Sequence, residues 1–196
     1  MSELEDRIAI RELIENWAVW RDAGMWEQFK TVWHDGAQMT ATWFAGPATE
    51  FIERSRESFA RGARAQHFLG GIAMDLNGTR AVAQTKMTIG VRASVEGVVC
   101  DILSSGRFYD LLEKRADRWG IVERRAIYEK DRLDPVDTGA VPKLDQTLLN
   151  SFPPGYRHLA YHLTRQGIVV KPNLPGAAGP ELSALYEVGR NWLSGH

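Results

Sequence analysis

The stretch from Ala65 to Lys130 most constrains the fold, because its apolar and polar residues alternate with a period of two. Such alternation is typical of half-exposed strands. Turn residues interrupt the stretch, and Asn77-Gly78 is a strong hairpin signal. We therefore expect four antiparallel strands joined by hairpins, over about residues 66–75, 81–92, 98–112 and 119–130.

The residues before this stretch follow a helical pattern. Apolar residues recur at steps of three and four from Ile10 to Trp17, as on the buried face of an amphipathic helix. Ser2 and Glu5 predict a capping box at the start of this helix, which ends near Ala23. The pattern predicts a short helix over residues 26–33, a strand over 38–44 and a third helix over 49–61. The fold class is α+β, with three helices packed on one face of a curved, mostly antiparallel sheet.

The composition changes after Asp134. Residues 134–155 are rich in Pro, Gly and Asp and read as a linker. Two short helices are predicted over about residues 156–166 and 180–193, with Pro180 in the first turn of the last one. Helices this short need a surface to pack on, so we expect a domain over residues 1–134 and an extension over 135–196 that packs on it or on a neighbouring subunit.

Several functional classes are excluded by composition. The formal net charge of −1 argues against nucleic-acid and anionic-membrane partners. No apolar run could span a bilayer, and the acidic start is unlike a signal peptide. Cys100 is the only cysteine, which favours a reducing, cytoplasmic location without disulfides. No P-loop, dinucleotide fingerprint or nucleophile elbow is present, so we expect no cofactor.

Asp22 is the residue that fits its surroundings least. Ile14, Ala18 and Asp22 follow one another at steps of four along the edge of the apolar stripe, just before Gly24 ends the helix. A solvated turn residue is one interpretation. The other is a carboxylate at the mouth of an apolar pocket, where it could orient a base.

Two strand residues are further candidates. His67 opens the first long strand, next to Gly70-Gly71, and is either a structural histidine or the partner of a helix carboxylate. Arg124 shares the less polar face of the last strand with Tyr128, so its guanidinium needs an anionic partner from the protein or a ligand. Asp101 and Arg107 also share a face, and we expect them to form an internal pair.

His158 and His162 stand four residues apart on a predicted helix, a spacing that can hold a metal ion. No nearby cysteine or acid completes a ligand set. We therefore predict no metal site.

Four local motifs, taken in order, resemble the SnoaL-like branch of the NTF2-like superfamily. They are R-x-L-I-x-N-W and R-D-A-G-x-W in the first helix, H-F-L-G-G at a strand start and D-R-W-G-I-V-E-R-R in the last strand. Relatives of this branch include scytalone dehydratase, hexachlorocyclohexane dehydrochlorinase, bile-acid 7α-dehydratase and the polyketide cyclases. The resemblance covers roughly residues 2–132 and implies an α+β cone whose sheet curls around a deep pocket.

The resemblance also implies a site. Asp22 and His67 match a helix Asp and a strand His that act together as the base in the dehydratase and dehydrochlorinase relatives, and Arg124 matches an Arg of the last strand. The chain departs from the pattern at Trp17, where those relatives often have a Tyr or Lys facing the pocket. An indole cannot protonate a leaving group, so Tyr128 is the residue that could supply the missing acid.

We therefore expect a cofactor-independent lyase, most simply a dehydratase, that acts on a bulky hydrophobic, aromatic or polycyclic small molecule. The aromatic and apolar residues expected to bind the substrate are Trp17, Met39, Trp43 and Phe44. The alternatives are a ketosteroid-isomerase-like or cyclase activity, retro-aldol cleavage that releases an aldehyde, and a non-catalytic role as a dioxygenase small subunit or ligand carrier. The resemblance further implies a homo-oligomer, with a trimer favoured.

Overall fold

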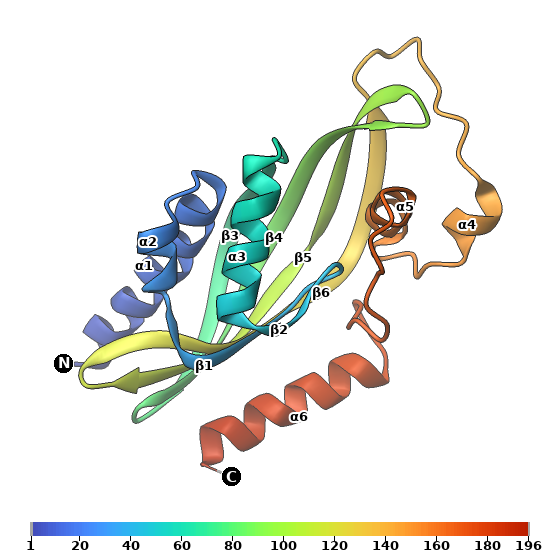
Figure 1. The fold of residues 1–196 in the computed structure, drawn as a ribbon. Coiled ribbons are helices and arrows are strands. Elements are labelled where there is room, and N and C mark those ends of the chain that lie inside the picture. The colour runs from blue at the N-terminus through green and yellow to red at the C-terminus, as the bar shows by residue number, and fades with distance from the viewer. Residues whose placement is uncertain (1, 196) are drawn as a thin grey trace.

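The structure is a computed structural model and describes residues 2–195. One six-stranded sheet has the spatial order β2-β1-β6-β5-β4-β3. Its strands are β1 (Trp33–Thr40), β2 (Ala45–Pro47), β3 (Ala65–Asn77), β4 (Arg80–Val95), β5 (Val98–Arg115) and β6 (Arg118–Pro135). The long strands β3 to β6 pair antiparallel, whereas β1 runs parallel to β6. The sheet is mixed, mostly antiparallel and strongly curved (Figure 1), which confirms the predicted fold class.

Three helices pack on the concave face of this sheet (Figure 1). They are α1 (Glu3–Asp22), α2 (Trp26–Lys30) and α3 (Ala48–Ala60). The predicted stripe of α1 is confirmed, since Ile10, Ile14 and Trp17 are buried. The capping box is present as well, with the Ser2 N–H donating to Glu5 Oε2 over 2.6 Å.

One boundary was predicted incorrectly. The second helix stops at Lys30 after little more than one turn, and Trp33 begins β1 instead of ending the helix. Trp33 pairs with Ile121 of β6, so a long-range strand contact overrides the local helical spacing. The single predicted strand is likewise two strands, because β1 ends at Thr40 and the chain returns along it as β2.

The segment after β6 contains three helices: α4 (Gln146–Asn150), α5 (Arg157–Arg165) and α6 (Pro180–Ser194). The first of these was missed, because five residues carry too little periodicity to distinguish a helix from a linker. Helix α5 packs against β5 and β6. Helix α6 lies on the opposite face of the sheet, where Leu182 and Leu185 join an apolar cluster with Tyr109, Leu111 and Ile127.

The expected pair of Asp101 with Arg107 does not form. Asp101 receives two hydrogen bonds from Arg92, and Arg107 binds Glu129. Six residues of extended chain span about 20 Å, so two residues at that spacing on one strand cannot touch. Cross-strand neighbours set the pairing instead, because Arg92 and Asp101 face each other between β4 and β5.

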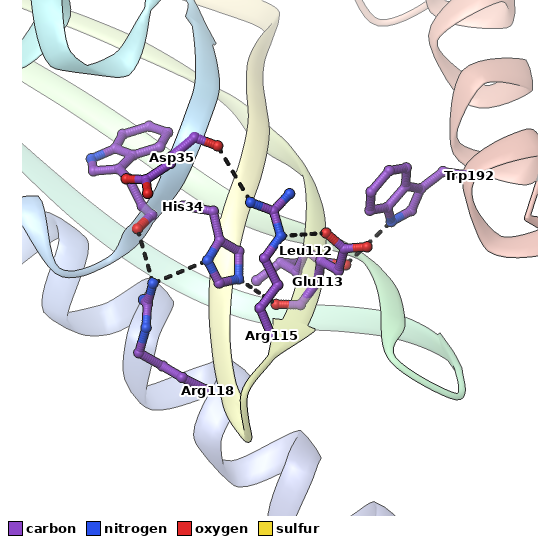
Figure 2. A network of polar contacts seen from close by, with 8 residues as sticks. His34, Asp35, Leu112, Glu113, Arg115, Arg118 and Trp192 are labelled. Atoms are coloured by element: carbon purple, nitrogen blue, oxygen red, sulfur yellow. Dashed lines mark hydrogen bonds and ion pairs between the residues drawn. The ribbon is translucent and has the colours of Figure 1, made fainter.

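A polar network around His34 ties β1 to the β5–β6 hairpin (Figure 2). His34 Nε2 donates to the Glu113 carbonyl over 2.8 Å, and Nδ1 accepts from Arg118 over 3.0 Å. Burial and the neighbouring arginines lower the pKa of His34, which fits this neutral tautomer. Gly120 leaves room for the ring, since a Cβ there would lie 2.8 Å from it. All the ring nitrogens are used, so this histidine is structural.

Candidate active site

A cavity of about 770 Å³ opens between the concave face of the sheet, α3 and α5. This volume is typical of sites for small organic ligands. Its walls are largely apolar and aromatic, and the residues that form them include Trp17, Met39, Trp43, Phe51, Phe108 and Leu159. Three of the four residues predicted to bind substrate (Trp17, Met39 and Trp43) therefore line the cavity. Phe44 does not, because it packs behind the wall against Phe51.

Asp22 and His67 meet at this cavity. The carboxylate is on the last residue of α1, which Gly24 terminates with a φ of +71°. Asp22 Oδ1 lies 2.7 Å from His67 Nδ1, and Asp22 Oδ2 accepts the backbone N–H of His67. One carboxylate therefore holds both the ring and the main chain of the β3 residue. Asp22 itself is not among the residues that line the cavity, so it can act there only through His67, which is one of them.

The electrostatics define the proton positions on this pair. Burial alone would raise the pKa of Asp22, but hydrogen bonds from His67 and the charge of Arg21 bring that pKa below its usual value. A carboxylate only accepts, so His67 carries its proton on Nδ1. Burial lowers the pKa of His67, Asp22 opposes this, and Arg21 and Arg124 lower the pKa further. His67 is thus neutral near pH 7, with the lone pair of Nε2 available to the cavity it lines.

Arg21 is a site residue that the sequence did not reveal. It lines the cavity, and its Nη1 donates to Asp22 Oδ1 over 3.2 Å. The side chain is only 15% exposed. Arg21 directly precedes Asp22 in the sequence. Charged residues at helix ends are usually exposed, and nothing in the sequence predicts that this guanidinium faces the cavity.

Arg124 has the anionic partner that the face argument required. Its Nε and Nη2 donate to the two carboxylate oxygens of Asp110 over 2.6 and 2.8 Å, and both side chains are fully buried. The guanidinium lies 4.3 Å from the ring centroids of Trp17 and of Phe108. Arg124 itself does not line the cavity. It supports two aromatic residues that do.

Tyr128 lines the cavity from β6. Its hydroxyl oxygen accepts the backbone N–H of Thr42 over 3.1 Å, which leaves the hydroxyl proton free to be donated. Burial raises the pKa of Tyr128, so the phenol is protonated near neutral pH. This is the arrangement expected of a hydrogen-bond donor to a ligand oxygen.

His158 and His162 have separate environments. His158 Nδ1 lies 2.9 Å from Asp131 Oδ1, whereas His162 lines the cavity. Within residues 2–195 no cluster of three or more His, Cys, Asp or Glu side chains could hold a metal ion. No helix in the same range is long and apolar enough to cross a membrane.

The helix-covered, curved open sheet and its deep cavity define the NTF2-like class of fold. The chain belongs to the SnoaL-like family, since residues 2–125 match the model of the SnoaL-like domain. Its relatives include a PEP2-like protein and pea pathogenicity protein 2, both from Fusarium vanettenii. They are 36% and 35% identical to it, over 97% of this chain and 86% of each relative.

Solved structures show the same fold at low sequence identity. A hexachlorocyclohexane dehydrochlorinase (LinA, type 2) superimposes with a TM-score of 0.60 at 15% identity, over 72% of this chain and 97% of that one. A candidate scytalone dehydratase from Novosphingobium aromaticivorans gives a TM-score of 0.57 at 15% identity, over 68% and 95%. The fold is thus related to that of dehydratases and dehydrochlorinases.

Proposed function

We propose that this protein is a cofactor-independent lyase that eliminates water from a bulky hydrophobic small molecule. The observation that carries the proposal is the Asp22–His67 pair, whose unprotonated Nε2 belongs to a residue lining a mostly apolar cavity. A neutral imidazole held by a carboxylate is a suitable general base. The apolar walls favour a ring-containing substrate.

In the proposed reaction His67 Nε2 removes a proton from a substrate carbon. The electron pair of the broken C–H bond forms a C=C bond, and the C–O bond to a hydroxyl group breaks. Tyr128 donates its proton to the departing oxygen, which leaves as water, and the proton on His67 then restores Tyr128 directly or through solvent. Asp22 stabilises the imidazolium formed in the first step.

Two cations assist the same step. Arg21 and Arg124 both disfavour a charged His67 in the resting protein, and the same positive field stabilises negative charge that develops on the substrate. Arg21 lines the cavity and can act directly. Arg124, locked to Asp110, acts at longer range and through the placement of Trp17 and Phe108.

The test is an assay of purified protein with a defined panel of β-hydroxyketones built on aromatic, alicyclic and polycyclic rings, in D₂O. Dehydration appears in mass spectra as the loss of one water. The competing isomerase and retro-aldol activities would instead give deuterium incorporation without mass loss, or a released aldehyde.

His67→Ala should abolish the loss of water. His158→Ala is the matched control, because that histidine also pairs with a carboxylate but does not line the cavity. Turnover that persists in a folded His67→Ala protein would rule out this base. Ligand binding without any turnover would favour the carrier function.

A further inference from the structure

Helix α5 is attached to the domain by its polar side chains and its first turn. Asp131 of β6 accepts the backbone N–H groups of His158 and Leu159 and the ring of His158, so it caps the helix. Tyr161 donates to Glu96 over 2.5 Å, and Arg165 pairs with the same carboxylate over 2.8 Å. The orientation of α5 relative to the sheet is therefore well determined.

His162 differs from these residues. It is 5% exposed, and its ring makes no hydrogen bond to any group within residues 2–195. The ring nitrogens of His162 are not among the fully buried side-chain atoms that lack a partner, so they keep some accessible surface. Because His162 lines the cavity beside Leu159 and Leu163, the partner of its ring belongs in the cavity. Burial lowers the pKa of His162, so near pH 7 the neutral ring offers one donor and one acceptor.

The two cavity histidines come from different elements of the cavity wall. His67 is on the edge strand β3, whereas α5 packs on β5 and β6. Strands β4 and β5 lie between β3 and β6, so β6 is three strand spacings from β3. This distance is roughly 14 Å along the sheet and less across its curve. The intervening walls are apolar, with Ile89 on β4 and Phe108 on β5. A ligand that reaches both histidines is therefore elongated, with oxygen atoms near both ends.

We propose that His162 binds a second oxygen function of the substrate, at the opposite end from the carbon that His67 deprotonates. This inference rests on the proposed function for the identity of the reacting end, but the binding of the second oxygen does not require turnover. The substrate class is a rigid, ring-based molecule with a hydroxyl or carbonyl group at each end.

The test uses two pairs of probes. 4,4′-Dihydroxybiphenyl is compared with 4-hydroxybiphenyl, and 2,6-dihydroxynaphthalene with 2-naphthol, by quenching of tryptophan fluorescence, since Trp17 and Trp43 line the cavity. In the wild type, the second hydroxyl should tighten binding by about threefold to tenfold for at least one pair. This gain should disappear in His162→Phe, return in part in His162→Gln, and persist in His158→Gln.

Long-range ¹H–¹⁵N spectra of the histidine rings supply a second measurement that does not depend on a variant. The better diol should shift the His162 ring signals and leave those of His158 unchanged, since His158 is already paired with Asp131. The proposal is overturned if neither second hydroxyl improves binding, or if the improvement survives in a folded His162→Phe protein. If the diol binds through His162 but no panel substrate is dehydrated, the proposed reaction fails while the binding site stands.

Discussion

The buried pair of Asp110 with Arg124 allows a quantitative prediction about stability. Both side chains are fully buried, and two hydrogen bonds join them. Replacing Asp110 with Asn leaves the Arg124 charge without its counterion in a site closed to water. Removal of one partner from such a pair typically costs about 3–5 kcal/mol, and for a chain of this size each kcal/mol lowers Tm by about 2–4 °C. We therefore expect Tm to fall by roughly 6–20 °C.

The control is the exposed pair of Arg92 with Asp101, whose side chains are 64% and 37% exposed. Asp101→Asn should cost less than about 1 kcal/mol, because solvent screens such pairs. The double variant Asp110→Leu with Arg124→Met removes both buried charges and should be more stable than Asp110→Asn alone. Urea and thermal unfolding followed by circular dichroism measure all three. If Asp110→Asn lowers the free energy of unfolding by less than about 1 kcal/mol, Arg124 does not depend on Asp110 as its counterion and the reasoning is refuted.

Four further predictions concern pH dependence, the C-terminal segment and metal ions. Because the pKa of His67 is lowered, kcat/KM should be flat above about pH 7 and decline only below the usual histidine pKa of about 6.5; a decline centred well above that value would contradict a neutral-imidazole base. Stability to urea should fall over the same acidic range, because His34, His67 and His162 all have lowered pKa values and the unfolded chain then binds more protons. A chain ending at Asp134 would expose Tyr109 and Ile127 and lose the part of the cavity wall that α5 supplies, so we expect it to be inactive or aggregation-prone. We expect the full chain to be a trimer. Light scattering after gel filtration measures the size of both proteins, and a truncated protein that is monodisperse and active would contradict the first expectation. Finally, a chelator should not change the activity and elemental analysis should find no stoichiometric metal; activity that depends on a removable metal would overturn the proposed chemistry.

The sequence predicted those features that depend on local periodicity. The alternation after Ala65 and the Asn77-Gly78 turn were sufficient for the β3–β4 hairpin, and the capping box marked the start of α1. Trp33 was misassigned because its parallel pairing with Ile121 involves a strand far away in the chain. Short-range patterns carry no information about such pairings.

Some residues of the candidate site, but not all, were identified from the sequence. Asp22 and His67 were identified through the resemblance, and the positions along the helix and strand agree with it. Arg21 was missed because no sequence pattern marks a charged residue at a helix end as facing inward, and Asp110 was missed because its apolar neighbours were not considered. Asp110, between apolar residues on both sides, was the one position where an unusual charge could have been noticed. His162 was considered only together with His158, although the two rings contact different parts of the molecule.

The central claim is that Asp22 and His67 act as one catalytic unit, and a double-mutant cycle tests it most directly. kcat/KM is measured for the wild type, Asp22→Asn, His67→Ala and the double variant, with circular dichroism to confirm folding. Each single change should lower kcat/KM by about 10² to 10⁴, the usual contribution of general-base catalysis. The double variant should be scarcely worse than His67→Ala, because residues that act as a unit lose activity non-additively. Fully additive losses, or a folded His67→Ala protein that keeps most of its activity, would mean that the base lies elsewhere.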